Sequence, residues 1–256
     1  PFEHEEQKIR IAIGGKYVSL SDSYVSVKEA IRHAAAQVGI KPEITFIDTE
    51  KVEQDFNELK KLDDIDGIII PGGFGYRGAE GKIKISEYAM NRSIPFLGLC
   101  FGFQLSIVMF SRSVLGLKDA NSTELDKDTQ YPVIDLLSEQ VDVDDKGGTM
   151  RLGGYEIKLD TKSKINRLYG KDIIRVRHRH RYIPNKIYEE KLVNKGLCIS
   201  GKSLNEDHTE VIELEDHPFF MSTQFHPEFT SRPERPDPVY LGFIEAAFKR
   251  KTKREK

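Results

Sequence analysis

The sequence has no tryptophan and only two cysteines, Cys100 and Cys198, in 256 residues. Two cysteines cannot form the disulfide framework typical of small secreted proteins, and this usage indicates a reducing compartment. The sequence also has no signal-peptide hydrophobic region and no run of ~18 apolar residues. We therefore expect a cytoplasmic protein without a membrane partner.

An excess of either charge is also missing, since 39 Lys and Arg residues face 41 Asp and Glu residues. This balance excludes the basic surface typical of nucleic-acid binding, so we expect no nucleic-acid partner. The seven histidines include no His-x-x-x-His pair, and no Cys-x-x-Cys occurs. His178 and His180 alternate with arginines, whose charge would repel a cation, so we expect no metal site.

Short apolar segments alternate with helical patterns through the first half of the chain. Strands are expected at residues 9–13, 43–47, 67–70 and 96–99, and helices at 26–38, 52–62, 83–91 and 103–110. Ser26 and Glu29 have the spacing of a capping box at the start of the first helix. This alternation predicts an α/β fold with a mostly parallel central sheet and helices on both faces.

From about residue 132 the pattern changes to short strands with glycine pairs between them. They are expected at residues 134–137, 150–152, 155–159, 173–176, 197–203 and 211–214. These segments predict small antiparallel additions beside the main sheet. A strand over 218–223 and a helix over 237–251 follow.

Residues 9–248 are expected to form one domain. Residues 1–8 are interpreted as a residual connector from a preceding segment, and residues 249–256 as a solvated basic tail.

Cys100 follows the apolar strand and lies in residues 98–102, which read Gly-Leu-Cys-Phe-Gly. A strand that ends in a glycine-flanked nucleophile and continues as an apolar helix is typical of a nucleophile elbow. The glycines are expected to allow a strained backbone. The free N–H groups of the helix would lower a thiol pKa from ~8.5 by one to several units. An inert buried cysteine is the alternative.

Residues 224–229 read Gln-Phe-His-Pro-Glu-Phe and follow the last expected strand. In an extended chain, residues two apart point to the same side, so His226 and Glu228 can face one site. A cysteine nucleophile needs a base that also serves as an acid, and a carboxylate that fixes the tautomer of that base. Cys100, His226 and Glu228 are therefore the predicted catalytic residues. A surface ion pair is the alternative for the last two.

Residues 71–78, Pro-Gly-Gly-Phe-Gly-Tyr-Arg-Gly, follow another buried strand. Their glycine spacing matches a dinucleotide fingerprint only weakly, because the strand is internal and no acidic residue follows at the required distance. Carboxyl ends of neighbouring parallel strands meet at one edge, so this loop should lie beside the cysteine. The N–H groups of Gly73 and Phe101 are the predicted oxyanion hole, and residues 76–82 a mobile lid. A simple tight turn is the alternative.

Glu124 and Arg181 together match the ammonium and carboxylate ends of a free amino acid. Solvated surface charges are the alternative. His178, Arg179 and His180 would then equally form a surface patch or a nucleotide-phosphate patch.

These segments together resemble the class I, or triad, glutamine amidotransferases. Within that family, the likeness is to the glutaminase domains of CTP synthases, over about residues 9–248. The resemblance is carried by residues 71–78, 98–104 (Gly-Leu-Cys-Phe-Gly-Phe-Gln), 177–182 (Arg-His-Arg-His-Arg-Tyr) and 224–229, and by 15–18 with 22–27. It implies a nucleophile, an acid/base and its partner at Cys100, His226 and Glu228. It also implies glutamine contacts, which are Gly73, Phe101, Gly102, Phe103, Gln104, Glu124 and Arg181. Phe101 and Phe103 stand where the family usually has aliphatic residues.

The resemblance further implies hydrolysis of L-glutamine to glutamate and ammonia through a cysteine thioester. The ammonia would serve ATP-dependent amination of UTP to CTP in pyrimidine nucleotide biosynthesis. No cofactor is expected in this domain: ATP, UTP and Mg belong to the N-terminal synthetase half, with GTP as an activator and a homo-oligomeric full-length enzyme. The alternatives are a glutaminase subunit of another synthetase, such as those for GMP or anthranilate, a γ-glutamyl hydrolase of the same fold, or a non-catalytic module.

Overall fold

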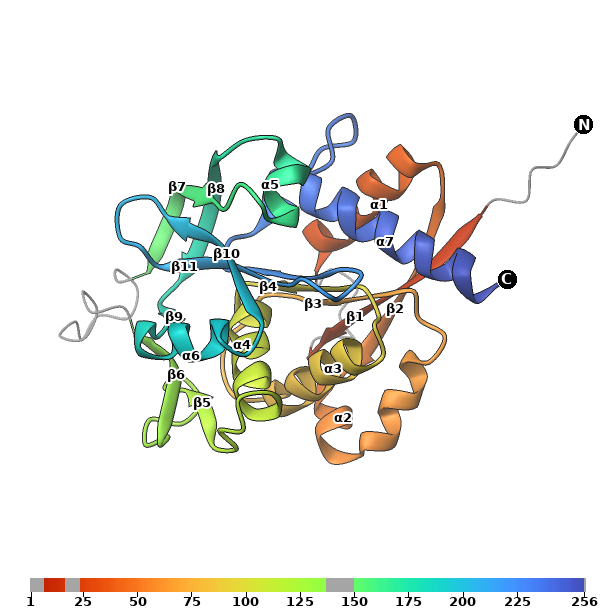
Figure 1. Ribbon diagram of the computed structural model, residues 1–256. Coiled ribbons are helices and arrows are strands. Elements are labelled where there is room, and N and C mark those ends of the chain that lie inside the picture. The colour runs from red at the N-terminus through yellow and green to blue at the C-terminus, as the bar shows by residue number, and fades with distance from the viewer. Residues whose placement is uncertain (1–6, 17–23, 137–149, 256) are drawn as a thin grey trace, which may run out of the picture.

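The structure is a computed structural model, and it describes residues 7–16, 24–136 and 150–255 (Figure 1). Within these residues the chain forms a nine-stranded sheet in the order β2-β1-β3-β4-β12-β11-β10-β7-β8. Its strands are β1 (Lys8–Gly15), β2 (Lys41–Asp48), β3 (Gly67–Ile70), β4 (Phe96–Leu99), β7 (Arg151–Leu159), β8 (Ile173–His180), β10 (Leu197–Ser203), β11 (Thr209–Leu214) and β12 (Phe220–Thr223). The expected α/β fold is confirmed.

The first five strands in this order pair in parallel, and the other four pair antiparallel at one side. Every residue of β3, β4 and β12 is buried, as in strands covered by helices on both faces. In β8 buried and exposed residues alternate. The antiparallel strands thus extend the same sheet as the parallel ones.

Helices cover both faces of the sheet, as Figure 1 shows. Helices α1 (Val25–Val38), α5 (Lys164–Tyr169) and α7 (Pro238–Arg254) lie on one face, and α3 (Ala79–Asn91) and α4 (Phe101–Ser113) lie on the other. The remaining helical segments are α2 (Thr49–Gln54), α6 (Glu189–Val193) and the 3₁₀ turns Phe56–Leu62, Lys186–Tyr188 and Pro227–Phe229. Each face has its own cluster of buried side chains.

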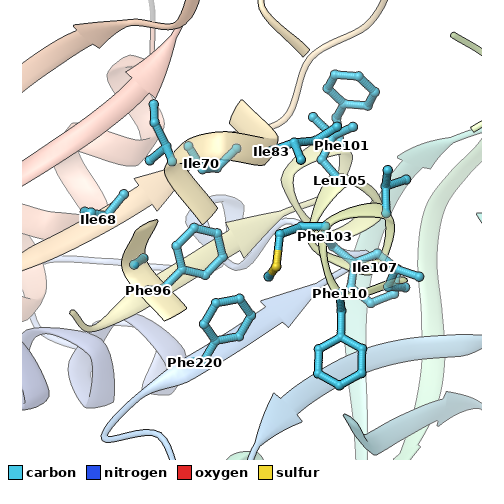
Figure 2. Packing of buried hydrophobic residues seen from close by; sticks show 14 of the residues in the cluster. Ile68, Ile70, Ile83, Phe96, Phe101, Phe103, Leu105, Ile107, Phe110 and Phe220 are labelled. Atoms are coloured by element: carbon cyan, nitrogen blue, oxygen red, sulfur yellow. The ribbon is translucent and has the colours of Figure 1, made fainter. Parts of the chain in front are cut away.

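The core beneath α3 and α4 is rich in aromatic rings (Figure 2). The rings of Phe96 in β4 and Phe220 in β12 stack with their centroids 4.5 Å apart. Phe103 is fully buried in the same cluster. Burial of such side chains contributes ~1.5–3 kcal/mol each, so this layer holds α4 firmly against the two strands that carry the site.

Several expected elements differ in the structure. The capping box is wrong: α1 begins at Val25, after Tyr24 in a left-handed conformation with no side-chain cap. The helix expected over 52–62 is interrupted at Asp55, whose carboxylate accepts a hydrogen bond from Asn57 N–H and starts a 3₁₀ turn. The two strands expected over 150–159 are one strand, β7, because its glycine pair stays in register with β8.

A second, three-stranded sheet lies beside the large one, in the order β5-β6-β9. It consists of β5 (Ala120–Ser122), β6 (Tyr131–Leu136) and β9 (Tyr182–Pro184). Strands β5 and β6 pair in parallel, so the expectation of a purely antiparallel addition is wrong here.

The boundaries expected at the two ends of the chain also differ from those in the structure. Lys8, expected in the connector, is the first residue of β1, and residues 1–6 lie outside the described chain. Helix α7 continues to Arg254, so the first part of the expected solvated tail is helical. Arg250 donates to the carbonyl oxygen of Ile65, which ties this last part of the helix to the chain that enters β3.

Across the described residues, no helix is long and apolar enough to cross a membrane.

Candidate active site

Cys100 lies at the turn between β4 and α4, where its φ of 50° and ψ of −99° are strained for a non-glycine residue. Its backbone N–H donates to Thr223 O at 2.8 Å, which fixes the turn to β12. As the residue that precedes α4, it lies at the positive end of the helix dipole. The predicted nucleophile elbow is present.

The flanking glycines have a different role from the expected one. Neither has a positive φ; the strained backbone belongs to Cys100 itself. A Cβ at Gly102 would lie 2.1 Å from Ile70 O, and one at Gly98 would lie 2.5 Å from Ser222 Oγ. Glycine is therefore required here because three strands and a helix approach one another closely.

His226 and Glu228 form the predicted pair, with His226 Nδ1 2.7 Å from Glu228 Oε1. The segment is not extended, however: residues Pro227–Phe229 form a 3₁₀ turn that begins after His226. The turn, not strand alternation, brings the carboxylate back to the ring. Because the carboxylate can only accept, Nδ1 carries the proton and Nε2 is left for chemistry.

Electrostatics around His226 favour the imidazolium. Burial lowers its pKa, but the Cys100 thiolate and the Glu228 carboxylate together outweigh burial and raise the pKa to about 10. The imidazole and the thiol line a common cavity of about 390 Å³. A Cβ at Gly72 would lie 2.9 Å from His226 Cε1 and 3.5 Å from Cys100 Cβ, so both side chains flank this glycine.

A second cavity of about 200 Å³ shares Gly73, Phe74 and Cys100 with the first. It is lined by Gly73, Phe74, Cys100, Phe101, Gln104, Glu124, Met150, His180, Arg181 and Tyr182. The glycine loop after β3 thus lies beside the cysteine, as expected. The expected lid is wrong in its second half, since residues from Ala79 onward form the first turn of α3 and Lys82 is buried there.

Glu124 and Arg181 both line this smaller cavity. Glu124 Oε1 accepts a hydrogen bond from Gly75 N–H at 2.9 Å, and burial raises the pKa of its carboxyl group. Arg181 Nε is buried and, among the described residues, has no hydrogen-bond partner. An unpaired buried donor of this kind is suited to a ligand carboxylate.

The other predicted glutamine contacts have different positions. Gln104 lines the cavity, but its amide also donates to Tyr182 O at 2.9 Å and to Gln224 Oε1 at 3.2 Å. The side chain of Phe103 is in the core, and Gly102 packs on β3. Their contacts with glutamine remain predictions.

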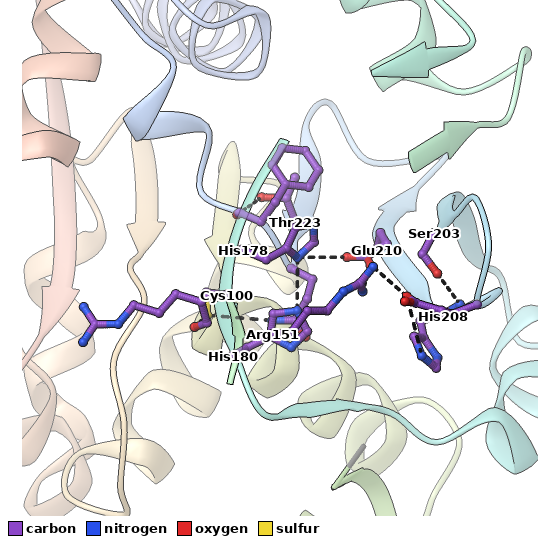
Figure 3. A network of polar contacts seen from close by, with 12 residues as sticks. Cys100, Arg151, His178, His180, Ser203, His208, Glu210 and Thr223 are labelled. Carbon is purple, nitrogen blue, oxygen red and sulfur yellow. Dashed lines mark hydrogen bonds and ion pairs between the residues drawn. The ribbon is translucent and has the colours of Figure 1, made fainter. Parts of the chain in front are cut away.

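His178 and His180 do not form the alternative surface patch, because alternation along β8 turns both rings inward (Figure 3). His180 Nδ1 donates to Tyr182 O at 3.0 Å, and His178 Nδ1 is 3.1 Å from His180 Nε2. Burial, with His180 and Arg151 nearby, lowers the pKa of His178 to about 2; burial and Arg151 lower that of His180 to about 3. Both rings are neutral links of a network.

One atom each of His178, His180 and Glu210 lie within 4.8 Å of one another, as metal ligands would. The group does not fit a metal ion. Arg151 donates to Glu210 Oε1 at 2.5 Å, and its guanidinium would repel a cation. The facing nitrogens of the two rings, His178 Nδ1 and His180 Nε2, already form a hydrogen bond with each other. The guanidinium that would repel a cation is that of Arg151 in β7; the prediction had assigned this effect to the alternating arginines of β8.

Sequence reasoning missed several groups at the thiol. Cys100 Sγ lies 3.6 Å from Arg179 O, and Gln224 Nε2 donates to Cys100 Sγ at 3.8 Å. His226 N–H donates to Arg177 O at 3.0 Å. Strand β8 therefore contacts Cys100 and His226 through its backbone. No side-chain pattern signals a backbone contact, but Gln224 is the first residue of the predicted segment 224–229 and was recognisable.

Comparison with known proteins agrees with this geometry. Residues 19–246 match the family described as Glutamine amidotransferase class-I. The chain belongs to this family. It is 50% identical over 251 residues to a CTP synthase from Archaeoglobus fulgidus, covering 97% of this chain and 46% of that protein. A CTP synthase from Saccharolobus solfataricus is 52% identical over 244 residues, 95% of this chain and 45% of that protein.

The chain thus spans about half the length of these curated relatives, 46% of the first. Among solved structures, the Trypanosoma brucei CTPS glutaminase domain with bound acivicin superposes with a TM-score of 0.88 and 36% identity. The match covers 94% of both chains. This amidotransferase domain is therefore of the CTP synthase glutaminase type.

Proposed function

We propose that this domain hydrolyses L-glutamine to glutamate and ammonia through a γ-glutamyl thioester on Cys100. The observation that carries the proposal is the strained cysteine at the elbow, which shares a cavity with the His226–Glu228 pair. Gly73, Glu124 and Arg181 line the smaller cavity beside the sulfur. Together these groups supply a nucleophile, an acid/base and contacts for both charged ends of an amino acid.

The reactive form has the proton on His226 and a thiolate at Cys100. The pKa of the imidazole, raised to about 10, favours the protonated ring in this form. Glu228 accepts a hydrogen bond from Nδ1–H of His226, so the proton that is transferred is the one on Nε2.

Acylation begins when the thiolate attacks the side-chain amide carbon of glutamine. The oxygen of the tetrahedral intermediate becomes negative and is bound by the N–H groups of Gly73 and Phe101. His226 gives its Nε2 proton to the amide nitrogen, the C–N bond breaks and ammonia leaves. The products of this step are the thioester and a neutral imidazole.

Deacylation reverses the roles of the same groups. Neutral His226 takes a proton from water, and the resulting hydroxide attacks the thioester carbonyl carbon. The C–S bond breaks, glutamate is released, and thiolate and imidazolium are restored. Arg181 holds the substrate carboxylate and Glu124 its ammonium throughout.

The experiment is ammonia release from glutamine labelled at the amide nitrogen. Cys100→Ala is expected to lose activity by more than about 10³-fold, because no other group can form the thioester. Cys198→Ala is the matched control and is expected to retain activity. Release by the Cys100→Ala protein at the parental rate would remove the proposal. An electrophilic glutamine analogue should add mass at Cys100 alone, and acivicin is expected to bind at the same site.

We further propose that the ammonia serves ATP-dependent amination of UTP to CTP in a longer cytoplasmic, homo-oligomeric protein. Support comes from relatives about 50% identical that bear the name CTP synthase and are about twice as long. In this proposal ATP, UTP and Mg bind the synthetase half, GTP activates, and the glutaminase domain itself binds no cofactor.

The test for this wider role is CTP formation by the chain joined to a synthetase half from such a relative. With glutamine as the nitrogen source, CTP should form only when Cys100 is intact, whereas ammonium salts should support both forms. Preference for γ-glutamyl peptides over free glutamine would instead favour a γ-glutamyl hydrolase.

A further inference from the structure

Lys82, in the first turn of α3, is a charged group that the mechanism above leaves unused. Only 1% of its surface is exposed, although lysine is almost never fully buried without a partner. Among the described residues, no carboxylate forms an ion pair with its Nζ atom. A buried amine in this state is destabilising, so its presence requires an explanation.

The position of the amine points to the active site. A Cβ at Gly73 would lie 3.4 Å from Lys82 Nζ, so the amine lies directly against the glycine loop. The same Nζ lies 5.0 Å from the centre of the Phe101 ring. Gly73 and Phe101 are the two residues whose N–H groups form the proposed oxyanion hole, and both line a cavity with Cys100.

The charges around Lys82 balance differently as the site ionises. Burial, then Lys16, lower its pKa to about 7, whereas the Cys100 thiolate and Glu124 act in the opposite direction. The ammonium is therefore favoured when negative charge is present on the sulfur. Because both groups are buried, the electrostatic attraction between the Lys82 ammonium and the sulfur is stronger than it would be in water.

We propose that the Lys82 ammonium supports the glutaminase reaction from behind the oxyanion loop, by stabilising negative charge on Cys100 and on the tetrahedral intermediate. Lys82 acts through the loop and the Phe101 ring and does not touch the substrate, so it is a positioning residue with an electrostatic effect. This inference rests on the proposed function and adds a further residue to it.

The test uses Lys82→Met, which removes the charge and nearly keeps the volume, in a Cys198→Ala background with one remaining thiol. The rate of alkylation of Cys100 by iodoacetamide is measured against pH. We expect the midpoint of thiolate formation to rise by about one pH unit, because a favourable charge has been lost. We also expect kcat/KM for glutamine to fall by about tenfold, mainly in kcat.

Lys84→Met is the matched control, since Lys84 lies on the same helix with its side chain 40% exposed and paired with Glu87. It should change neither the thiolate midpoint nor kcat. The melting temperature separates a structural role from an electrostatic one: Lys82→Met should keep or raise it, because a buried charge is removed. If Lys82→Met does not fold, Lys82→Gln is measured in the same way.

An unchanged thiolate midpoint in an otherwise active Lys82 variant would overturn this inference and leave the proposed function intact. If the unsubstituted protein itself releases no ammonia, the proposed function fails first. A lowered melting temperature with unchanged titration would assign Lys82 to packing alone.

Discussion

At the scale of single residues, the site needs two glycines that leave no room for a side chain as much as it needs the reactive side chain of Cys100. Cys100 bears the strained backbone, while Gly98 and Gly102 let α4 and β12 approach the turn. The strain on the nucleophile persists because the surrounding packing determines it. Glycine substitutions therefore test the geometry of the elbow without touching the thiol.

Gly102→Ala is expected to destabilise the protein by about 1–3 kcal/mol, because the new Cβ must displace the Ile70 backbone. The clash distance is 2.1 Å to a carbonyl oxygen that cannot rotate away. Activity should fall further than stability, since the elbow itself shifts. Urea unfolding and ammonia release measure the two effects. Ser113→Ala, at the exposed end of the same helix, is the control and loses only a surface hydrogen bond to Glu87; equal stability of the two variants would contradict the prediction.

The pH dependence of the reaction should follow His226. Its pKa is raised to about 10, so its contribution to stability is complete below ~6.5, the pKa of an unfolded histidine, and is lost as pH rises through about 10. Glu228→Gln removes one of the charges that favour the imidazolium. The alkaline limb of kcat/KM should therefore move to lower pH. The measurement is a pH–rate profile, and an alkaline limb that does not move would refute the role of Glu228.

At the scale of elements, strand β8 is the support of the site. Its carbonyl groups contact Cys100 Sγ and His226 N–H. The inward ring of His178 lies 3.7 Å from Glu210 of β11, which pairs with Arg151 of the neighbouring β7. Burial raises the pKa of Glu210 to about 8, although Arg151 acts in the opposite direction. The cost of burying Glu210 is therefore offset only while Arg151 is present.

Arg151→Met should destabilise the protein by about 1–3 kcal/mol, because it leaves the buried carboxyl group of Glu210 without its hydrogen-bond partner. Arg151→Met combined with Glu210→Leu should recover most of that loss, since an apolar pair of similar volume avoids the desolvation penalty. Chemical unfolding of the single and double variants provides the measurement. Equal stability of both would show that the pair carries no coupling.

Some elements could be predicted from the sequence and others could not, for a physical reason. β3 and β4 have the predicted bounds because a strand buried on both faces is a continuous apolar run. The 3₁₀ turn after His226 was mistaken for extended chain, because Pro227 is compatible with both conformations. Lys82 occupies a buried position of α3, three residues after Ala79 and four before Ser86, so helical periodicity could have identified it.

At the scale of the whole molecule, the active site lies at the carboxyl ends of the parallel strands, and α7 runs across one face of the sheet to the far edge (Figure 1). Arg254 forms an ion pair of 3.6 Å with Asp66, a residue 2% exposed that also accepts from Arg10 N–H. The C-terminal residues thus hold the helix against the amino-terminal end of β3, whereas Cys100 lies at the carboxyl ends of the strands.

Removal of residues 249–256 should lower stability by about 2 kcal/mol through lost hydrogen bonds, and the melting temperature by about 4–8 °C. Glutaminase activity at 25 °C should stay close to the parental value. Thermal unfolding with an activity assay checks both, and Lys253→Ala, which is exposed, is the control. An unchanged melting temperature would return these residues to the solvated tail expected from their composition.

The sequence by itself determined the α/β architecture, the elbow at Cys100, the His226–Glu228 pair and the family, because these depend on local patterns of apolar runs, glycine and reactive side chains. The tertiary structure alone decided that Cys100 itself bears the strain, that β8 holds it by backbone contacts, and that Lys82 lies behind Gly73. These relations join residues far apart along the chain through packing distances, and such distances leave no local pattern in the sequence.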